Sequence, residues 1–582
     1  MKFARLAEYF ERLEGTTKRL EMFQILSELF KEAEVEEIDK VVYLCQEQLL
    51  PPFRGLEIGM AEKLIARSVA RATDRQDGEV MAEYKRLGDL GLVVEELLQK
   101  KAKRQALDVV TVYEELFKIA RTAGEGSVEQ KIQLLGDLIR QASPREARYI
   151  VRFAMGQLRL GIGDPTILDA LSVAEVQDRS FRPSLERAYN LCSDLGLVAE
   201  TLFAKGKKGI QEFKVSVGSP IRMAMAERLA TAEEIVKKIG RCSVEGKFDG
   251  LRMQVHKMGD QVEAFSRNLE RMTPMVPDLV EATRRQIKAK EAIFEGEAVA
   301  VNEETGELHP FQVTVQRKRK YGIEEMTKEF PLVLFAFDLL YADGVDYTQR
   351  PYLERREKLA RLIGKGDRIR LAETLITDDP ERIKRYFDES IERGLEGILA
   401  KRLDAPYQAG ARNFNWIKLK RSYKGELADT IDVVVVGYFK GRGSRAQFGI
   451  GALLGAVYDE ATDTFKTVAK IGSGLTEEEW VRAREFLDQL RVGHRPARVD
   501  SLIGPDVWVE PKSVFTVLAD EITKSPVHTC GKSGEEPGYA LRFPRIVGWV
   551  REDKGPEDAT TVKEIVKLYR MQKHVKAVGA GA

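Results

Sequence analysis

The chain has 582 residues, of which 43% are hydrophobic, so it is too long for one hydrophobic core and we expect roughly three to four domains. The 93 Lys and Arg residues nearly balance the 92 Asp and Glu residues, which excludes an overall basic field, so any site for a polyanion must be local. The sequence has no apolar run close to the roughly 20 residues that span a bilayer, and its four cysteines form no C-x-x-C pair. These features argue against a membrane span, a disulfide framework and a zinc site.

The first part of the chain, up to about residue 213, is predicted to be helical almost throughout. It starts with MKFARLAEYFERLEG, an amphipathic helix rather than a secretory signal, so we expect a cytoplasmic protein. Residues 56–62 (LEIGMAE) are echoed by residues 158–164 (LRLGIGD), each before another helical stretch, which indicates pseudo-symmetry. Glycine turns that lead into helices expose N–H groups that can hold DNA phosphates. Two ordinary helix–helix turns are the alternative.

From residue 216 to about residue 423 the pattern changes to mixed α/β. The central motif of this region is VEGKFDGLR at residues 244–252. Lys247 stands between carboxylates and glycines, and the alternating run after it predicts a strand, a turn near Gly259 and a second strand. A lysine attacks phosphorus only as the neutral amine, so a nucleophilic lysine needs a lowered pKa. We therefore predict that Lys247 is a nucleophile at a strand edge that faces a cleft. Taken alone, this motif is equally typical of a solvated lysine in a turn.

Further polar patterns follow in order along this region. In FEGEAVAV (294–301), alternation places Glu295 and Glu297 on one side of a strand, where they suit a metal or a ribose. In FAFDLLY (335–341), an aromatic side chain stacks on a base or packs in the core. In WIKLK (416–420), Lys418 and Lys420 share a face, where they would bind phosphates and depress the pKa of Lys247. A basic run at residues 317–320 is a candidate DNA contact.

Beyond about residue 423 the sequence is rich in short strands. Residues 431–438 (IDVVVVGY) predict a buried strand, and GALLGAVYD, TFKTVAKIG and VWVEP predict others, with a helix in LTEEEWVRAREFLDQL. This pattern fits an OB-fold, a small β-barrel that often binds oligonucleotides. A terminal helix is predicted to begin at Thr561, which starts a capping box with Glu564.

The ordered set KFDGLR, SRN, FEGEAV, FAFDLLY, EGILAK and WIKLK resembles the nucleotidyltransferase superfamily of DNA ligases, RNA ligases and capping enzymes. With the helical first part and RFPRI at residues 542–546, the whole chain resembles an ATP-dependent DNA ligase of the archaeal and eukaryotic replicative type. The resemblance implies an all-α DNA-binding domain at residues 1–215, an α+β adenylation domain at 216–424 and a C-terminal β-barrel OB-fold with a final helix at 425–582.

The resemblance also implies a role for each matching residue. Lys247 is the lysine that becomes adenylated, Asp249 orders its loop, and Glu297 and Glu396 are the metal ligands. The residues implied to bind the nucleotide or its neighbours are Glu245 at the adenine, Arg252 and Arg267 at the ribose and the DNA phosphate, Glu297 at the ribose, Phe337 on the base, Arg412, Lys418 and Lys420 at the phosphates, and Arg542 and Arg545 at the pyrophosphate leaving group.

The implied activity is the sealing of nicks in duplex DNA, through a lysyl-AMP enzyme and a 5′-adenylated DNA, with ATP as adenylate donor and Mg²⁺ as cofactor. The implied partner is nicked double-stranded DNA, and we expect a monomer. A sliding clamp is a further partner of such ligases, but the docking motif is not evident, because residues 105–110 (QALDVV) contain no aromatic side chain. Clamp binding therefore stays open.

Other classes fit the sequence less well. An RNA ligase or capping enzyme shares the lysine motifs but does not need the large helical region, and an NAD-dependent ligase normally carries cysteine-rich zinc modules. A DNA-binding scaffold without activity would have no reason to keep Lys247 together with Glu297, Glu396 and Lys418. The sequence therefore favours an enzyme that transfers a nucleotidyl group to DNA.

Overall fold

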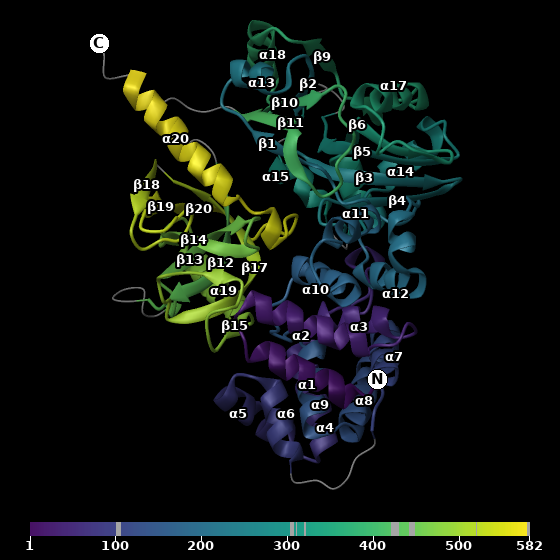
Figure 1. The fold of residues 1–582 in the computed structure, drawn as a ribbon, viewed down its shortest axis with the longest axis vertical. Coiled ribbons are helices and arrows are strands. Elements are labelled where there is room, and N and C mark those ends of the chain that lie inside the picture. The colour runs from purple at the N-terminus through teal and green to yellow at the C-terminus, as the bar shows by residue number, and fades with distance from the viewer. Residues whose placement is uncertain are drawn as a thin grey trace. The chain divides into compact units, whose positions relative to one another are not determined.

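The computed structural model describes residues 1–99, 106–302, 308–309, 311–318, 322–420, 430–441, 448–519 and 521–578 (Figure 1). The chain forms two compact units. The first contains Met1–Tyr189, Asp194–Phe213 and Gln489–Arg498, and the second contains Asn190–Ser193, Lys214–Asp488 and Val499–Ala582. Among the described residues, every helix falls short of the length or the apolar character that a membrane-spanning segment needs. The predicted boundary at 424–425 lies outside the described residues.

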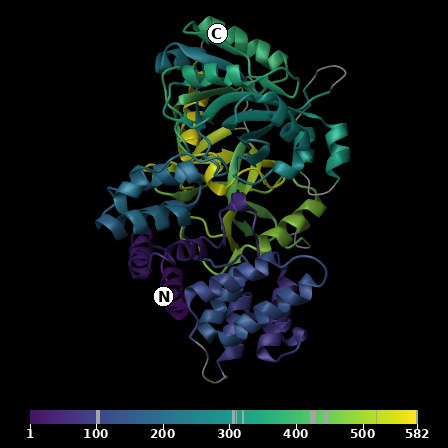
Figure 2. The same ribbon diagram turned by 90° about the vertical axis from the view of Figure 1, so that its right-hand side faces the viewer.

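The first unit is helical, as predicted (Figures 1 and 2). Local sequence explains where helices begin: the Ser143 hydroxyl accepts a hydrogen bond from the Glu146 N–H, the Glu146 carboxylate accepts one from the Ser143 N–H, and Pro144 occupies the first helical position. Its helices are α1 (Phe3–Glu14), α2 (Arg19–Glu32), α3 (Ile38–Cys45), α4 (Glu62–Thr73), α5 (Asp77–Leu87), α6 (Leu90–Leu98), α7 (Val109–Arg121), α8 (Ser127–Gln141), α9 (Pro144–Ala154), α10 (Asp164–Val176), α11 (Arg182–Cys192), which ends in the second unit, and α12 (Leu195–Gln211).

The contacts between helices agree with the predicted pseudo-symmetry if α1–α6 are matched with α7–α12. Helices of each half pack on helices of the other half in matching pairs. The contact of α4 with α8 matches that of α10 with α2, and the contact of α6 with α9 matches that of α12 with α3. The sequence analysis missed the matching DLGLV segments at 89–93 and 194–198. In each, the aspartate caps the helix, and the glycine permits close packing, since a Cβ would lie 2.7 Å from Arg152 at Gly91 and 2.3 Å from Tyr43 at Gly196.

The second unit contains two sheets that face each other, with helices on the outer faces (Figure 1). Helices α13 (Ala232–Ile239) and α18 (Pro380–Glu392) cover one sheet, and α14 (Pro277–Gln286) and α17 (Tyr352–Leu362) cover the other. The first sheet has the order β1 (Met225–Arg228), β11 (Arg412–Lys420), β10 (Gly397–Arg402), β2 (Cys242–Lys247), β9 (Thr374–Thr377). The second has the order β4 (Gln261–Ser266), β3 (Leu251–Met258), β5 (Glu291–Ala300), β6 (Leu332–Ala342), β7 (Val345–Asp346), with β8 (Ile369–Leu371) beside β6.

A buried cluster joins the two sheets and forms the aromatic end of the cavity described below. It includes Ile293 from β5, Phe337 and Leu340 from β6, and Trp416 from β11. The predicted hairpin is confirmed, since β3 and β4 pair antiparallel across a turn in which Gly259 has φ of 58°. A left-handed backbone of this kind favours glycine.

The C-terminal part of the second unit is strand-rich. The strand Ile431–Phe439 (β12) is buried on both faces, because Val433, Val434, Val435 and Val436 are all 0% exposed. It pairs with Val507–Leu518 (β17) and Ala452–Asp459 (β13), and the sheet continues through Thr464–Ile471 (β14) to Val499–Asp500 (β16), with Arg545–Gly548 (β20) beside β17. Glu521–Ser525 (β18) and Gly538–Arg542 (β19) pair separately, and the predicted helices are present as α19 (Glu477–Asp488) and α20 (Val562–Val578).

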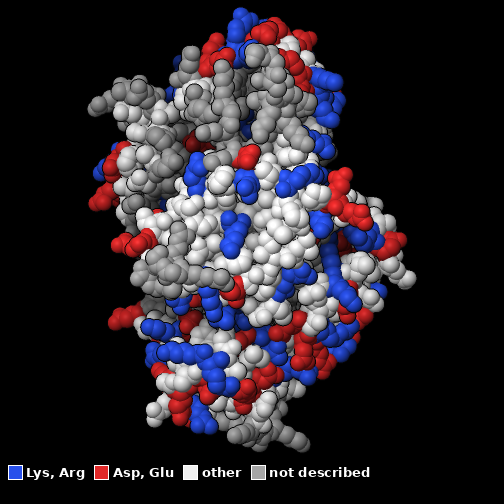
Figure 3. All heavy atoms as spheres, turned by 90° about the vertical axis from the view of Figure 1, so that its left-hand side faces the viewer, with Lys and Arg blue, Asp and Glu red and all other residues white. Residues whose placement is uncertain are grey.

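The distribution of charged side chains agrees with the sequence analysis except at the basic run of residues 317–320. Lys and Arg are interspersed with Asp and Glu over much of the face in Figure 3, as the balanced totals predict. The interpretation of residues 317–320 as an exposed DNA contact is wrong for Arg317, which is 2% exposed and pairs with Asp278 at 2.8 Å. Lys318 pairs with Glu270 at 2.7 Å, and the last two residues of the run lie outside the described residues.

Candidate active site

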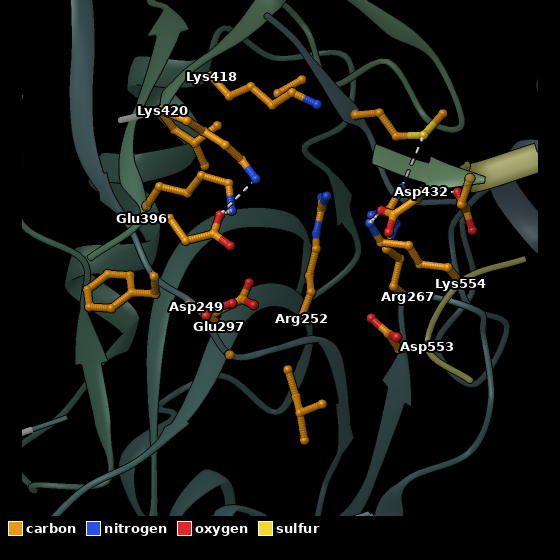
Figure 4. Close-up of a pocket in the computed structure, with 18 of the residues that line it drawn as sticks. Asp249, Arg252, Arg267, Glu297, Glu396, Lys418, Lys420, Asp432, Asp553 and Lys554 are labelled. Atoms are coloured by element: carbon orange, nitrogen blue, oxygen red, sulfur yellow. Dashed lines mark hydrogen bonds and ion pairs between the residues drawn. The ribbon is translucent and has the colours of Figure 1, made fainter. Parts of the chain in front are cut away.

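A cavity of about 280 Å³ lies in the second unit between the two sheets and the C-terminal segment that leads into α20 (Figure 4). Its lining includes nearly all the residues predicted to act on a nucleotide, which are Glu245, Lys247, Asp249, Arg252, Arg267, Glu297, Phe337, Glu396, Arg412, Lys418 and Lys420. These residues come from β2, β3, β5, β6, β11 and the loops beside them, so the fold brings together motifs that are far apart in the sequence.

Lys247 is the last residue of β2 and forms an ion pair with Glu396, which directly precedes β10. The antiparallel register explains the contact, because Lys247 lies opposite Gly397. Burial favours the neutral amine, but the charges of Glu396, Glu297 and Asp249 outweigh it, and the pKa of Lys247 is raised above its ordinary value. The prediction that Lys418 and Lys420 depress this pKa is therefore wrong as to the net shift. The carboxylates around the lysine control it.

Asp249, Glu297 and Glu396 lie near one another in Figure 4, and the charges of all three raise the pKa of Lys247. Burial and the charge of Glu396 raise the pKa of Asp249 to about 6, and burial raises the pKa of Glu297 to about 7. Burial acts against the charge of Glu396, but Lys247 and Lys420, the latter at 3.3 Å, hold the pKa of Glu396 below its ordinary value. So much negative charge in one cavity is typical of a place where cations bind.

The described residues form no complete metal site. In the described ranges, the side chains of His, Cys, Asp and Glu form no group of three or more that could hold a metal by itself. Mg²⁺ usually keeps several waters and takes one or two carboxylates together with substrate phosphates. Glu297 and Glu396 fit that donor set, and their assignment as metal ligands stays a prediction.

Cations also line the cavity, and Lys418, Arg412 and Arg267 contact acidic residues of the C-terminal segment. Lys418 and Lys420 both line the cavity, which agrees with their predicted shared face. Lys418 pairs with Glu564 at 2.8 Å, and burial lowers the pKa of Lys418 to about 8. Arg412 pairs with the same carboxylate at 2.7 Å, and Arg267 pairs with Asp558 at 3.1 Å.

Aromatic side chains form the inner end of the cavity. Phe337 is 6% exposed and contacts Trp416 edge to face, with ring centroids 5.9 Å apart, so it both packs in the core and lines the cavity. The Arg252 guanidinium lies 5.5 Å from the Phe337 ring centroid and pairs with Glu295 at 2.9 Å. Glu295 is fully buried, whereas Glu297 lines the cavity. Of the two glutamates predicted on this face, one therefore orients an arginine and the other faces the cavity.

Arg542 and Arg545 lie elsewhere. They are exposed side chains at the end of β19 and the start of β20, on either side of Phe543, and neither is among the residues that line the cavity. The C-terminal cations that line it are Arg551, paired with Asp553 at 2.6 Å, and Lys554, paired with Asp432. Sequence reasoning missed them, because REDK at 551–554 reads as a solvated run of charges. The nearby RFPR motif drew the assignment instead.

A lysine beside cations and carboxylates, with aromatic rings at the far end of the cavity, is the arrangement expected of a nucleotidyltransferase site. Comparison with known proteins agrees with this class. Three family models match: "DNA ligase N terminus" over residues 2–172, "ATP dependent DNA ligase domain" over 223–420 and "ATP dependent DNA ligase C terminal region" over 446–554.

Relatives match along the whole chain. The "Probable DNA ligase" of Dictyoglomus turgidum is 56% identical over 576 residues, which cover 99% of each chain. The "DNA ligase" of Hyperthermus butylicus is 46% identical over 597 residues, which cover 98% of each. The protein described here belongs to the ATP-dependent DNA ligase family, whose adenylate donor is ATP and whose usual divalent ion is Mg²⁺.

Proposed function

We propose that the protein seals nicks in duplex DNA through an adenylated Lys247. The observation that carries this proposal is the position of Lys247 at the end of β2, between Glu396 on one side and a cavity lined by Lys418 and Arg412 on the other. The neutral Nζ attacks the α-phosphorus of ATP, an N–P bond forms, and the bond to the β-phosphate oxygen breaks as pyrophosphate leaves. The adenylate then passes to the 5′-phosphate of the nick, and attack by the 3′-hydroxyl joins the strands and releases AMP.

Lys247 must lose a proton before it reacts, and Glu396 is the carboxylate nearest to that proton. The same carboxylate also holds the ammonium in its charged form, so deprotonation requires the negative charge around Lys247 to fall. A Mg²⁺ ion held by Glu297 and Glu396 would supply that charge compensation. Lys418, Lys420 and Arg412 would hold the phosphates, in exchange for the acidic side chains that they contact now.

We assign the pyrophosphate-orienting role to Arg551 and Lys554 rather than to Arg542 and Arg545, because the former pair lines the cavity.

The C-terminal sheet has the strand content of an OB-fold, and we propose that fold for residues 425–582, beside the adenylation domain at 216–424 and the helical domain at 1–215. The exposed RFPR segment then suits contact with the duplex. Arg551→Ala should slow enzyme adenylation and spare the sealing of a nick that already carries a 5′-adenylate. Arg542→Ala should spare adenylation and weaken nick binding, so the reverse pattern would return the role to Arg542.

The helical unit would hold the duplex by its backbone amides. Gly59 and Gly161, at equivalent points of the two repeats, have φ of 62° and 67°, which fits the predicted glycine turns. Sequence-independent binding that weakens as salt rises is the expected behaviour. In the stretch considered for a sliding clamp, Leu107 is 3% and Val109 is 0% exposed, residue 105 lies outside the described residues, and clamp binding stays open. A cytoplasmic, monomeric enzyme stays a prediction.

Incubation with radiolabelled ATP, followed by denaturing electrophoresis, tests the proposal directly. Label at the α-phosphate should stay on the protein in the presence of Mg²⁺, and label at the γ-phosphate should not. Lys247→Ala should remove the signal, whereas Lys290→Ala, which changes an exposed lysine of the same unit, should retain it. Transfer of γ label, or undiminished labelling of Lys247→Ala, would reject the mechanism.

A further inference from the structure

A second lysine–glutamate pair is sealed inside the same sheet. The Lys401 ammonium lies 2.6 Å from the Glu245 carboxylate, and their side chains are 0% and 2% exposed. Lys401 lies on β10 and Glu245 on the neighbouring strand β2, two residues before Lys247. Neither the family match nor the resemblance gives Lys401 a role.

The surroundings of Lys401 connect it to the base end of the cavity. Its Nζ lies 4.3 Å from the ring centroid of Trp416 and 4.4 Å from that of Phe337, both of which line the cavity. It also donates to the Phe337 carbonyl at 3.4 Å. Lys401 itself lies behind the cavity wall, whereas Glu245 is part of the wall.

Stability does not explain why this pair is charged. A buried ion pair gains little over a well-packed apolar pair, because desolvation offsets the attraction. The arrangement does, however, fix the Glu245 carboxylate. One oxygen accepts from Lys401, and the other is 3.4 Å from the Tyr352 hydroxyl, so acceptor positions remain on a carboxylate that faces the cavity.

We propose that Lys401 sets the base specificity of the enzyme, by holding the Glu245 carboxylate as a hydrogen-bond acceptor toward position 6 of the nucleotide base. Adenine carries an amino group there and donates to the carboxylate. Guanine carries a carbonyl oxygen there, which places two acceptors against each other. The pair therefore admits ATP and rejects GTP. Lys401 is a positioning residue, since it acts through Glu245 and does not touch the nucleotide, and the inference rests on the adenylation of Lys247 proposed above.

A site built to hydrogen-bond one substrate group can reject an analogue that lacks it by about 10⁴-fold. Removal of Lys401 leaves the buried Glu245 carboxylate without the cation that holds it in place. A carboxylate that is no longer held toward position 6 distinguishes the two bases less well. We expect a loss of discrimination rather than a uniform loss of activity.

The experiment compares α-labelled ATP with α-labelled GTP in single-turnover adenylation of the full chain. The measured quantity is the ratio of the two kcat/KM values, for the native protein, Lys401→Met, Glu245→Gln and the double variant. Lys257→Met is the matched control, because Lys257 is also a buried lysine of this unit, but it donates to the Ile287 carbonyl and is not among the residues that line the cavity. We expect the ratio of kcat/KM for ATP to kcat/KM for GTP to fall by at least about tenfold in each single variant. In the double variant this ratio should fall no further than in either single variant. The Lys257 control should keep the native ratio.

The outcomes separate this inference from the proposed function. No labelling of the native protein by either nucleotide would reject the adenylation mechanism itself. Native labelling without preference for ATP, or a Lys401→Met variant whose activity falls equally with both nucleotides, would overturn the role of Lys401. If Lys401→Met does not fold, the double variant removes both charges together and decides the question, since a native ratio in that variant would also overturn the proposal.

Discussion

The two lysine–glutamate pairs of strands β2 and β10 and the residue before β10 have the same chemistry and different surroundings. Lys247 and Glu396 have side chains that are 23% and 27% exposed, at the wall of the cavity. Lys401 and Glu245 are 0% and 2% exposed, behind that wall. Carboxylates outweigh burial and raise the pKa of Lys247, whereas burial outweighs Glu245 and lowers the pKa of Lys401.

The difference agrees with the proposal that the Lys247 pair reacts while the Lys401 pair only positions. Lys247 has a partner that Lys420 also contacts at 3.3 Å, so Glu396 keeps a cation when Lys247 leaves it to attack. Lys401 has aromatic rings around it and a carboxylate that would lose its buried partner if the lysine moved. The first pair can therefore open at little cost, and the second stays closed.

The largest expected effect comes from Lys247→Arg. Arginine keeps the positive charge and the ion pair with Glu396, but the guanidinium stays protonated and offers no neutral amine. We expect adenylation by α-labelled ATP to fall by about 10⁴-fold or more. The free energy of unfolding should stay within about 1 kcal/mol of the native value, because a partly exposed ion pair contributes little. Appreciable adenylation of this variant would mean that the reactive lysine is another one.

The second prediction applies one substitution to both pairs. Lys401→Met should lower the free energy of unfolding by about 3–5 kcal/mol, because it leaves a buried carboxylate without its partner. Lys247→Met should lower it by about 1 kcal/mol or less, since Glu396 retains Lys420. Urea unfolding followed by tryptophan fluorescence measures both, and Trp416 lies in contact with Lys401. Equal losses would show that the two pairs do not differ in the way that their burial indicates.

The smallest expected effect is a shift in pH dependence. Glu396 is the strongest of the charges that raise the pKa of Lys247, so Glu396→Gln should lower that pKa, and burial then favours the neutral amine. The rise of the adenylation rate with pH should therefore begin at lower pH than in the native protein, even though the maximum rate falls. Glu245→Gln removes the carboxylate of the other pair and should leave the midpoint of the pH–rate profile for adenylation unchanged. A midpoint that moves equally in both variants would contradict the separation of the pairs.

Much of the candidate site could be predicted from the sequence. The period of two in WIKLK places Lys418 and Lys420 on one face of a strand, and both line the cavity. The capping pattern at Thr561 and Glu564 predicts the start of α20, and the structure forms those hydrogen bonds. These predictions succeed because each depends on residues within one turn of helix or a few residues of strand.

The errors concern partners that are distant along the chain. Nothing local distinguishes REDK at 551–554 from RFPR at 542–545, and only the folded C-terminal segment places the former at the cavity. The net charge around Lys247 could not be summed until the register of β2 and β10 placed Glu396 beside it. The buried state of Arg317 likewise depends on Asp278, 39 residues earlier.

The sequence by itself determined the order of the motifs, the helical and strand-rich regions, and the lysine that we propose reacts, because residue type and short-range periodicity carry that information. The tertiary structure alone decided which charges neutralise one another. Sheet register pairs Lys247 with Glu396 and Lys401 with Glu245, and burial then gives the two lysines opposite pKa shifts. The physical reason is that the strength of a charge interaction depends on distance and on exclusion of water, and both are properties of the packed fold.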